Sequence, residues 1–212
     1  MNFSTTRVSP ILFLFGSAFA GSLILSALPQ HAAPPAPASG IVLELDPAQC
    51  AVHWTLGTTL HTVHGTFALK NGSIQLDPAT GKATGEILVS ATSAESGNDS
   101  RDKKMHKDVL ESGRYPDIVF RPDRFEGTLA QDGLSTLQLH GTFSIHGLEH
   151  EMTVITQGEL SGDHWTGHAK FSIPFIEWGL KNPSNFLFKV NHSVELEVDL
   201  KGKLQISILP HA

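Results

Sequence analysis

Residues 165–175 read WTGHAKFSIPF, and the fold can be inferred from this stretch because its pattern repeats every two residues. One set of alternate positions is apolar or small: Trp165, Gly167, Ala169, Phe171, Ile173 and Phe175. The positions between them are mostly polar or charged: Thr166, His168, Lys170 and Ser172. Successive side chains of a strand point to opposite faces. The stretch therefore predicts a β-strand with one buried face.

The same period recurs on both sides of this stretch. Residues 137–145 (LQLHGTFSI) repeat it, and in residues 186–208 the even positions carry nearly all of the apolar side chains, with Gly202 where a coiled strand could bend. Shorter strand signals cover residues 41–45, 52–56, 63–69, 73–76, 83–91, 118–125 and 152–160. A last strand this long is typical of a closed sheet, so we predict an all-β, extended antiparallel barrel of about eight strands.

Turn residues and one charged segment interrupt the strands. Turns are predicted at Asn71-Gly72, Asp77-Pro78, Thr80-Gly81 and Asp132-Gly133, where the residue types suit a chain reversal. Residues 98–113 (NDSRDKKMHKDVLESG) lack the alternation and predict one short helix. We expect Asp99 or Ser100 to cap its start and Gly113 to end it.

The first forty residues differ in composition from the rest. Residues 1–28 contain Arg7, no acidic residue and an apolar run over residues 11–28, which predicts an export signal or an uncleaved N-terminal anchor. Residues 29–40 are rich in Pro and Ala and predict a spacer. Residues 41–212 then form one domain of ordinary size. We expect it to be periplasmic or secreted, or anchored to the inner membrane and facing the periplasm.

Charge and cysteine content exclude some functions. The formal net charge of the chain is −6, and acidic and basic residues are interspersed without a basic cluster, so nucleic acid is not expected as a partner. Cys50 is the only cysteine, which excludes an intramolecular disulfide. Its simplest role is that of a small buried side chain.

Four segments together resemble the YceI-like polyisoprenoid-binding proteins, a family of exported lipocalin-like barrels. They are SAESGNDSRDKKM (residues 93–105), RYPDIVF (114–120), GTFSIHGLEHEMTV (141–154) and IPFIEWGLKNPS (173–184). The resemblance implies an eight-stranded barrel closed by a helix, with an apolar lumen for a polyisoprenoid, an isoprenoid quinone tail or a similar lipid. It implies a carrier or sequestration role. Family members often have a histidine where this chain has Leu56-Gly57, so no ligand-contacting histidine is transferred.

The expected ligand contacts come from the apolar face and the segments that resemble the family. Small residues on that face, such as Gly65, Gly85, Gly141 and Gly167, could leave a slot between aromatic rings, or could serve only the coiling of the strands. His61 or His192 could bond a ligand oxygen, or could simply lie in the wall. The predicted lining is Phe67, Val89, Phe120, Phe143, Ile145, Phe171, Ile173, Phe175, Trp178, Phe186, Phe188, Val190, His192 and Val194.

Other functions find less support in the sequence. Residues 146–150 (HGLEH) match the inverted zinc-peptidase pattern H-x-x-E-H, but the flanking strands predict a hairpin and not the helix that this chemistry needs. A surface metal held by His146 and His150 remains an alternative. Arg101 and Asp102 could form a structural ion pair or contact a ligand headgroup. We expect no enzyme activity and no cofactor other than a bound lipid. A homodimer is possible, and a non-enzymatic stress or interaction module with a filled core is the other alternative.

Overall fold

The structure is a computed structural model that describes residues 39–130, 132–184 and 189–208. These residues belong to a compact unit that spans Ala36–Ala212. The predicted export segment, residues 1–28, and most of the predicted spacer lie outside the described residues. Within the described ranges, no helix is long and apolar enough to cross a membrane.

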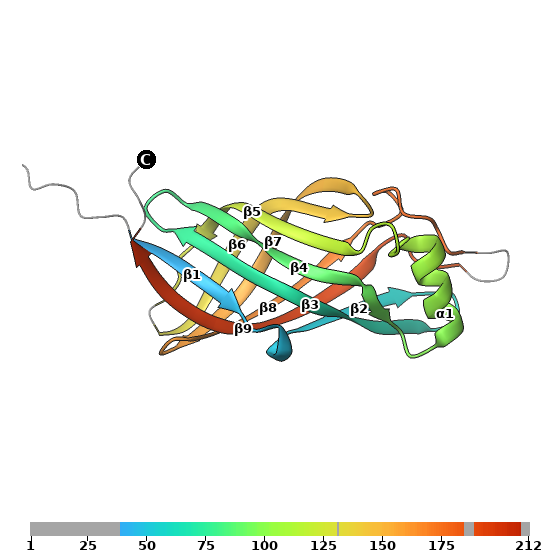
Figure 1. The fold of residues 1–212 in the computed structure, drawn as a ribbon, viewed down its shortest axis with the longest axis horizontal. Coiled ribbons are helices and arrows are strands. Elements are labelled where there is room, and N and C mark those ends of the chain that lie inside the picture. The colour runs from blue at the N-terminus through green and yellow to red at the C-terminus, as the bar shows by residue number, and fades with distance from the viewer. Residues whose placement is uncertain (1–38, 131, 185–188, 209–212) are drawn as a thin grey trace, which may run out of the picture. The chain divides into compact units, whose positions relative to one another are not determined.

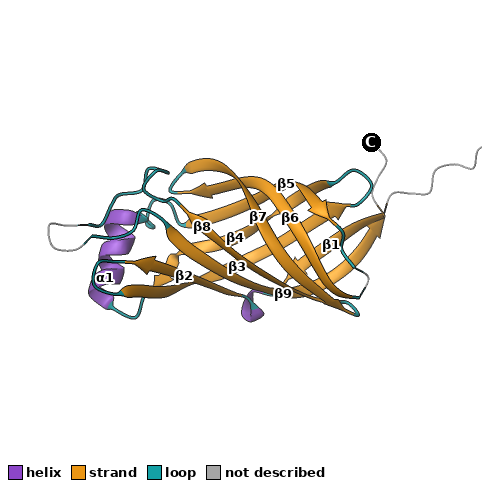
Figure 2. Cartoon of the chain, turned by 180° about the vertical axis from the view of Figure 1, so that it is seen from behind, coloured by secondary structure: helices purple, strands orange, loops and turns teal. Residues whose placement is uncertain are grey.

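Strands make up most of the unit (Figures 1 and 2). In chain order they are β1 Ser39–Leu45, β2 Ala51–Gly57, β3 Thr62–Asp77, β4 Lys82–Glu95, β5 Asp117–Gly127, β6 Gly133–Ile145, β7 Leu148–Ser161, β8 His164–Ile173 and β9 Val194–Ile208. Every pairing is antiparallel, and from β2 to β9 each strand pairs with the next one in sequence. The result is an up-and-down sheet.

The sheet closes because β1 and β2 share one place in it. Both strands pair with β3 on one side and with β9 on the other. The nine strand segments therefore occupy eight positions around a closed barrel, which confirms the predicted fold class. Closure matters because it leaves few unpaired strand edges.

The break between β1 and β2 has a local cause. Asp46 caps the short turn η1 (Pro47–Gln49) by accepting a hydrogen bond from the backbone N–H of Ala48 at 3.0 Å. Cys50 follows, and its Sγ accepts a hydrogen bond from the backbone N–H of Lys201 at 3.3 Å. Burial raises the pKa of the Cys50 thiol above its ordinary value, although the hydrogen bond with Lys201 works in the opposite direction. The raised pKa disfavours the reactive thiolate.

Two sequence-based boundaries are wrong. Asn71-Gly72 is not a turn: β3 continues through it, and the pairing with β4 shifts register between Leu69 and Asn71 as a bulge. The last strand begins at Val194 and not near residue 186, and Ile206 on its even face is 75% exposed. The turn predicted around Asp77-Pro78 and Thr80-Gly81 is confirmed, with Gly81 at φ 72°.

The predicted helix is present at one end of the barrel, near the end of β2 and the start of β3 (Figures 1 and 2). It consists of α1 (Asp99–Lys104) and the π-helical turn η2 (Met105–Val109). The predicted caps are wrong. Asn98 caps the start, because its side chain accepts a hydrogen bond from the N–H of Arg101 at 3.0 Å. The chain leaves the helix through Glu111, at φ 45°, and not at Gly113.

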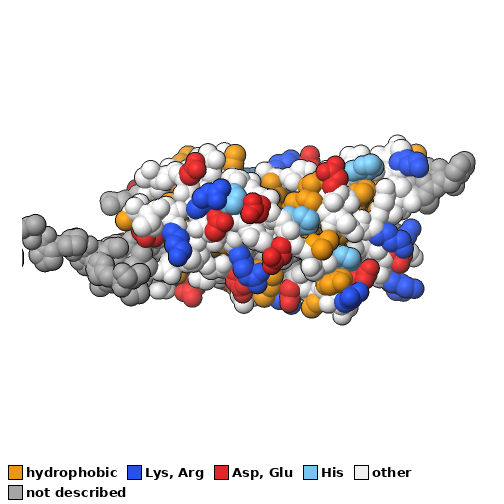
Figure 3. All heavy atoms as spheres, turned by 90° about the horizontal axis from the view of Figure 1, so that it is seen from above, with side chains coloured by type: hydrophobic (Ala, Val, Ile, Leu, Met, Phe, Trp, Pro, Cys, Tyr) orange, Lys and Arg blue, Asp and Glu red, His pale blue; other side chains and the backbone are white. Residues whose placement is uncertain are grey.

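The alternation predicted for the wall is confirmed on the long strands. On β6 the side chains of Leu137, Leu139, Phe143 and Ile145 are buried inside. On the outside of the barrel, the polar side chains pair across strands, as His168 does with Asp199 at 2.8 Å. Figure 3 shows acidic and basic side chains mixed over the visible face of the described part.

The pairing between β7 and β8 is incomplete. These strands pair only from Thr156 with Ala169 to Ser161 with His164. Residues 148–155 of β7 pair with β6 alone. The segment that follows β8, residues 174–180, packs against this unpaired part, and we call it the strap. In the strap, the Trp178 ring stacks on the His150 ring with centroids 4.1 Å apart.

Candidate lipid-binding cavity

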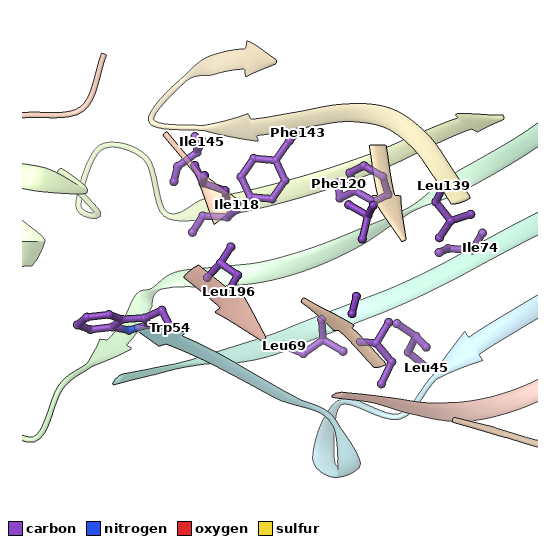
Figure 4. Packing of buried hydrophobic residues seen from close by; sticks show 14 of the residues in the cluster. Leu45, Trp54, Leu69, Ile74, Ile118, Phe120, Leu139, Phe143, Ile145 and Leu196 are labelled. Atoms are coloured by element: carbon purple, nitrogen blue, oxygen red, sulfur yellow. The ribbon is translucent and has the colours of Figure 1, made fainter. Parts of the chain in front are cut away.

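The barrel encloses a cavity of about 420 Å³ that is lined mostly by apolar side chains. Every strand from β1 to β9 contributes lining side chains, and so does the helix. Figure 4 shows Trp54, Leu69, Phe120 and Phe143 extending from different strands toward the shared interior. The volume lies in the range of small-molecule pockets.

Ten of the fourteen predicted ligand contacts line this cavity. They come from β3, β4, β5, β6, β8 and β9 and from the segment between β8 and β9. Their role in binding remains a prediction, but the structure places them around one space. They are Phe67, Val89, Phe120, Phe143, Ile145, Phe171, Ile173, Phe175, Val190 and Val194.

Of the other four predicted contacts, two do not line the cavity and two lie outside the described residues. Trp178 stacks on His150 and lies 5.7 Å, centroid to centroid, from Phe143, so it covers the unpaired part of β7. His192 is exposed and precedes β9. Phe186 and Phe188 lie outside the described residues. The even-number pattern misplaced His192 because the strand begins only at Val194.

Several lining residues were missed or left open by the sequence analysis. Arg101, Lys104, Met105 and Val109 line the cavity from the helix. Their spacing of three to four residues is that of one helix face, a signal that could have identified this group once a helix was placed over the barrel end. His61 also lines the cavity, from the connection between β2 and β3.

The inward glycines do not open the cavity in the way that the sequence suggested. A Cβ at Gly65 would collide with the indole of Trp54, and a Cβ at Gly167 would collide with the indole of Trp165. Both tryptophans are buried and line the cavity. These two glycines therefore make room for rings of the wall itself. Gly141 instead lies against the backbone of β5, next to a register shift.

A hydrogen-bond network fixes the start of the helix against the end of β4. The Ser96 hydroxyl accepts from Nε of Arg101 at 2.7 Å and donates to the Asp102 carboxylate, while Nη2 of Arg101 donates to the Ser96 carbonyl at 2.9 Å. Burial opposes the ionisation of Asp102, but the hydrogen bonds from Ser96 and the charge of Arg101 outweigh it. The pKa of Asp102 therefore lies below its ordinary value, and the carboxylate stays charged.

This network predicts a pH-dependent contribution to stability. The pKa of Asp102 is lower in the folded protein than its ordinary value of 3.8, so the ionised carboxylate stabilises the fold above that value. The contribution is lost as the pH falls through the folded pKa. We expect Asp102→Asn to lower the free energy of unfolding at neutral pH, and the difference from the wild type to shrink in acid, as measured by urea unfolding. Asp99→Asn, at an exposed position of the same helix, is the control. A pH-independent difference would contradict the prediction.

The HGLEH string forms a hairpin, as predicted. Ile145 pairs with Leu148, so His146 and Gly147 are the two turn residues, both with positive φ (55° and 75°). His146 packs on the Tyr115 ring with centroids 4.5 Å apart, whereas His150 pairs with Phe143 across the strands. The two histidines are therefore not cross-strand partners. Over the described ranges, no group of three or more His, Cys, Asp or Glu side chains is placed to hold a metal ion.

Comparison with known proteins points to one family. A family model described as the YceI-like domain matches residues 43–202. A search of the curated proteins found no match. Among solved structures, the chain is similar to BcnA of Burkholderia cenocepacia, with a TM-score of 0.61 and 16% identity, over 74% of this chain and 99% of that chain.

Two further structures show the same fold. A domain from Saccharophagus degradans, described as polyisoprenoid binding and implicated in plant cell wall breakdown, has a TM-score of 0.59 at 14% identity and covers 80% of this chain and 100% of its own. The YceI protein of Campylobacter jejuni has a TM-score of 0.53 at 16% identity, over 68% of this chain and 86% of its own. The family match extends from β1 to β9 and includes the helix, and the chain therefore belongs to the YceI-like domain family.

Proposed function

We propose that this protein binds a long-chain isoprenoid, an isoprenoid quinone or a similar amphiphile inside the barrel. The apolar cavity of about 420 Å³ is the observation that carries the proposal. The likeness to a domain described as polyisoprenoid binding supports it. The proposed role is that of a carrier or sequestering protein without catalysis, and the proposed compartment, periplasmic or secreted, rests on the composition of residues 1–28.

The energetics of the cavity suit a hydrocarbon tail. Burial of a chain yields roughly 0.8 kcal/mol per methylene group, before the costs of ordering and association are subtracted. A tail that fills the cavity would therefore bind tightly without any polar contact, and the shape of the wall would set its preference for one tail over another. The alternative of a barrel with a filled core, which acts through its surface, is disfavoured by the presence of the cavity.

Native mass spectrometry of the full chain purified from cells tests the proposal. We expect a population carrying one long-chain lipid per protein, which organic extraction would release for chemical identification. After extraction, the refolded protein should take up an added prenol or quinone at the same ratio. A protein that is empty as purified and does not bind either added compound would refute the proposal and favour the surface-acting alternative.

A further inference from the structure

The charged side chains that line the cavity are of one sign. Arg101 and Lys104 line it, and its described lining contains no Asp or Glu. This contrasts with the chain as a whole, whose formal net charge is −6. Arg101 is half-buried and Lys104 is exposed at the edge of this apolar space, and the partial loss of hydration at Arg101 is unfavourable unless a polar or charged partner compensates it. A bound ligand could supply a negative group that faces Arg101 and Lys104.

The two cations lie at one end of the cavity. They are three residues apart on α1 and so share one helix face, which continues into the apolar side chains of Met105 and Val109. Thr58 and His61, from the connection between β2 and β3, line the same end, since α1 lies beside the end of β2 and the start of β3 (Figure 1). The rest of the lining is almost entirely apolar. The cavity is thus polar and cationic at the helix end and apolar along the barrel.

The hydrogen-bond network around Ser96 leaves part of the positive charge of Arg101 and Lys104 available to a ligand. It engages Nε and Nη2 of Arg101, and no hydrogen bond of Nη1 is found over the described residues. The charge of Arg101 acts on the Asp102 carboxylate, but Asp102 accepts its hydrogen bond from Ser96 and does not line the cavity. Lys104 is exposed and forms no ion pair with any residue that the structure describes. Its ammonium group is therefore free to meet an anion.

We propose that the ligand is an amphiphile with an anionic headgroup, a carboxylate or a phosphate, which lies at the helix end against Lys104 and Arg101 while its tail extends into the barrel. This inference rests on the proposed function and adds the class of headgroup and the direction in which the ligand lies. Charge-assisted hydrogen bonds to such a headgroup are stronger than those to a neutral one.

Three ligands with the same tail test the inference: hexadecanol, hexadecanoate and hexadecyl phosphate, added to the delipidated full chain at mildly alkaline pH. Binding can be followed through the fluorescence of Trp54 and Trp165, which line the cavity. We expect at least one of the two anions to bind about tenfold more tightly than the alcohol. The anion that binds more tightly identifies the headgroup as a carboxylate or a phosphate. Added salt should reduce the difference in affinity between that anion and hexadecanol, because it screens the charges.

Variants of adjacent lysines supply the matched control. Lys104→Gln should weaken binding of the preferred anion about three- to fivefold and leave hexadecanol unchanged, because the side chain is partly screened by solvent. Lys103 is one residue away, is exposed and does not line the cavity. Lys103→Gln should therefore leave the affinities for all three ligands unchanged. Equal affinities for all three ligands would overturn the headgroup proposal and leave lipid binding intact. Failure of all three to bind would overturn the headgroup proposal, and uptake of an added prenol or quinone by the same protein would show that the proposed function still stands.

Discussion

Phe171→Asp is expected to abolish retention of a long-chain lipid while the barrel remains folded. Phe171 lines the cavity from β8, opposite Leu196 of β9, and is half-buried. An ionised carboxylate at this position would lose its hydration when a tail fills the cavity, at a cost of several kcal/mol. We expect bound lipid to fall at least about tenfold, since each 1.4 kcal/mol is a factor of ten. Native mass spectrometry measures the lipid-bound fraction.

Two controls separate this effect from damage to the barrel. Phe171→Leu keeps an apolar side chain in the cavity and should retain lipid. Thr166→Asp places the same carboxylate on the outward face of the same strand, where Thr166 is exposed, and should also retain lipid. Circular dichroism checks that all three variants are folded. If Phe171→Asp kept its full lipid content, the tail would not lie along this part of the wall.

The largest loss of stability is expected for Leu137→Ala. Leu137 lies on β6 between Gly127 of β5 and Thr156 of β7 and is only 1% exposed. Truncation of a buried leucine removes its apolar contacts and leaves a void, and it typically costs about 2–5 kcal/mol. Urea unfolding of the variant should show a decrease of this size in the free energy of unfolding, with an unchanged slope.

Leu134 on the same strand is the matched control. It is 79% exposed, and Leu134→Ala should change the free energy of unfolding by less than about 0.5 kcal/mol. The two variants delete the same atoms from the same strand, so the difference between them reports burial alone. Similar losses for both variants would mean that the inside and the outside of β6 are assigned incorrectly.

The sequence predicted the wall well because the wall depends on a local rule. Alternation assigns Leu137, Phe143 and Ile173 to the inside without knowledge of their partners, and all three line the cavity. The rule fails where a residue type has two uses. Asn71-Gly72 suits a hairpin turn, but here β3 continues through the pair directly after a bulge at Lys70, and only the pairing with β4 reveals it.

Contacts between distant segments limited the prediction of the site. Trp178 belongs to the strap, and its position follows from the His150 ring, 28 residues earlier, which no local pattern indicates. Likewise, Lys104 reads as one of several charged residues on a solvated helix. Its place in the lining becomes apparent only when the helix is seen at the barrel end.

The incomplete pairing between β7 and β8 also has a consequence for how cargo could be exchanged. Where two strands of the wall are paired, separating them breaks a ladder of backbone hydrogen bonds, as between β8 and β9. Along residues 148–155 of β7, the strap is held mainly by side chains such as Trp178, and its release would sacrifice ring stacking instead. Local opening is least costly where such ladders are missing. Local separation of the strap from residues 148–155 would therefore open the side of the barrel while the strand ladders on either side stay paired.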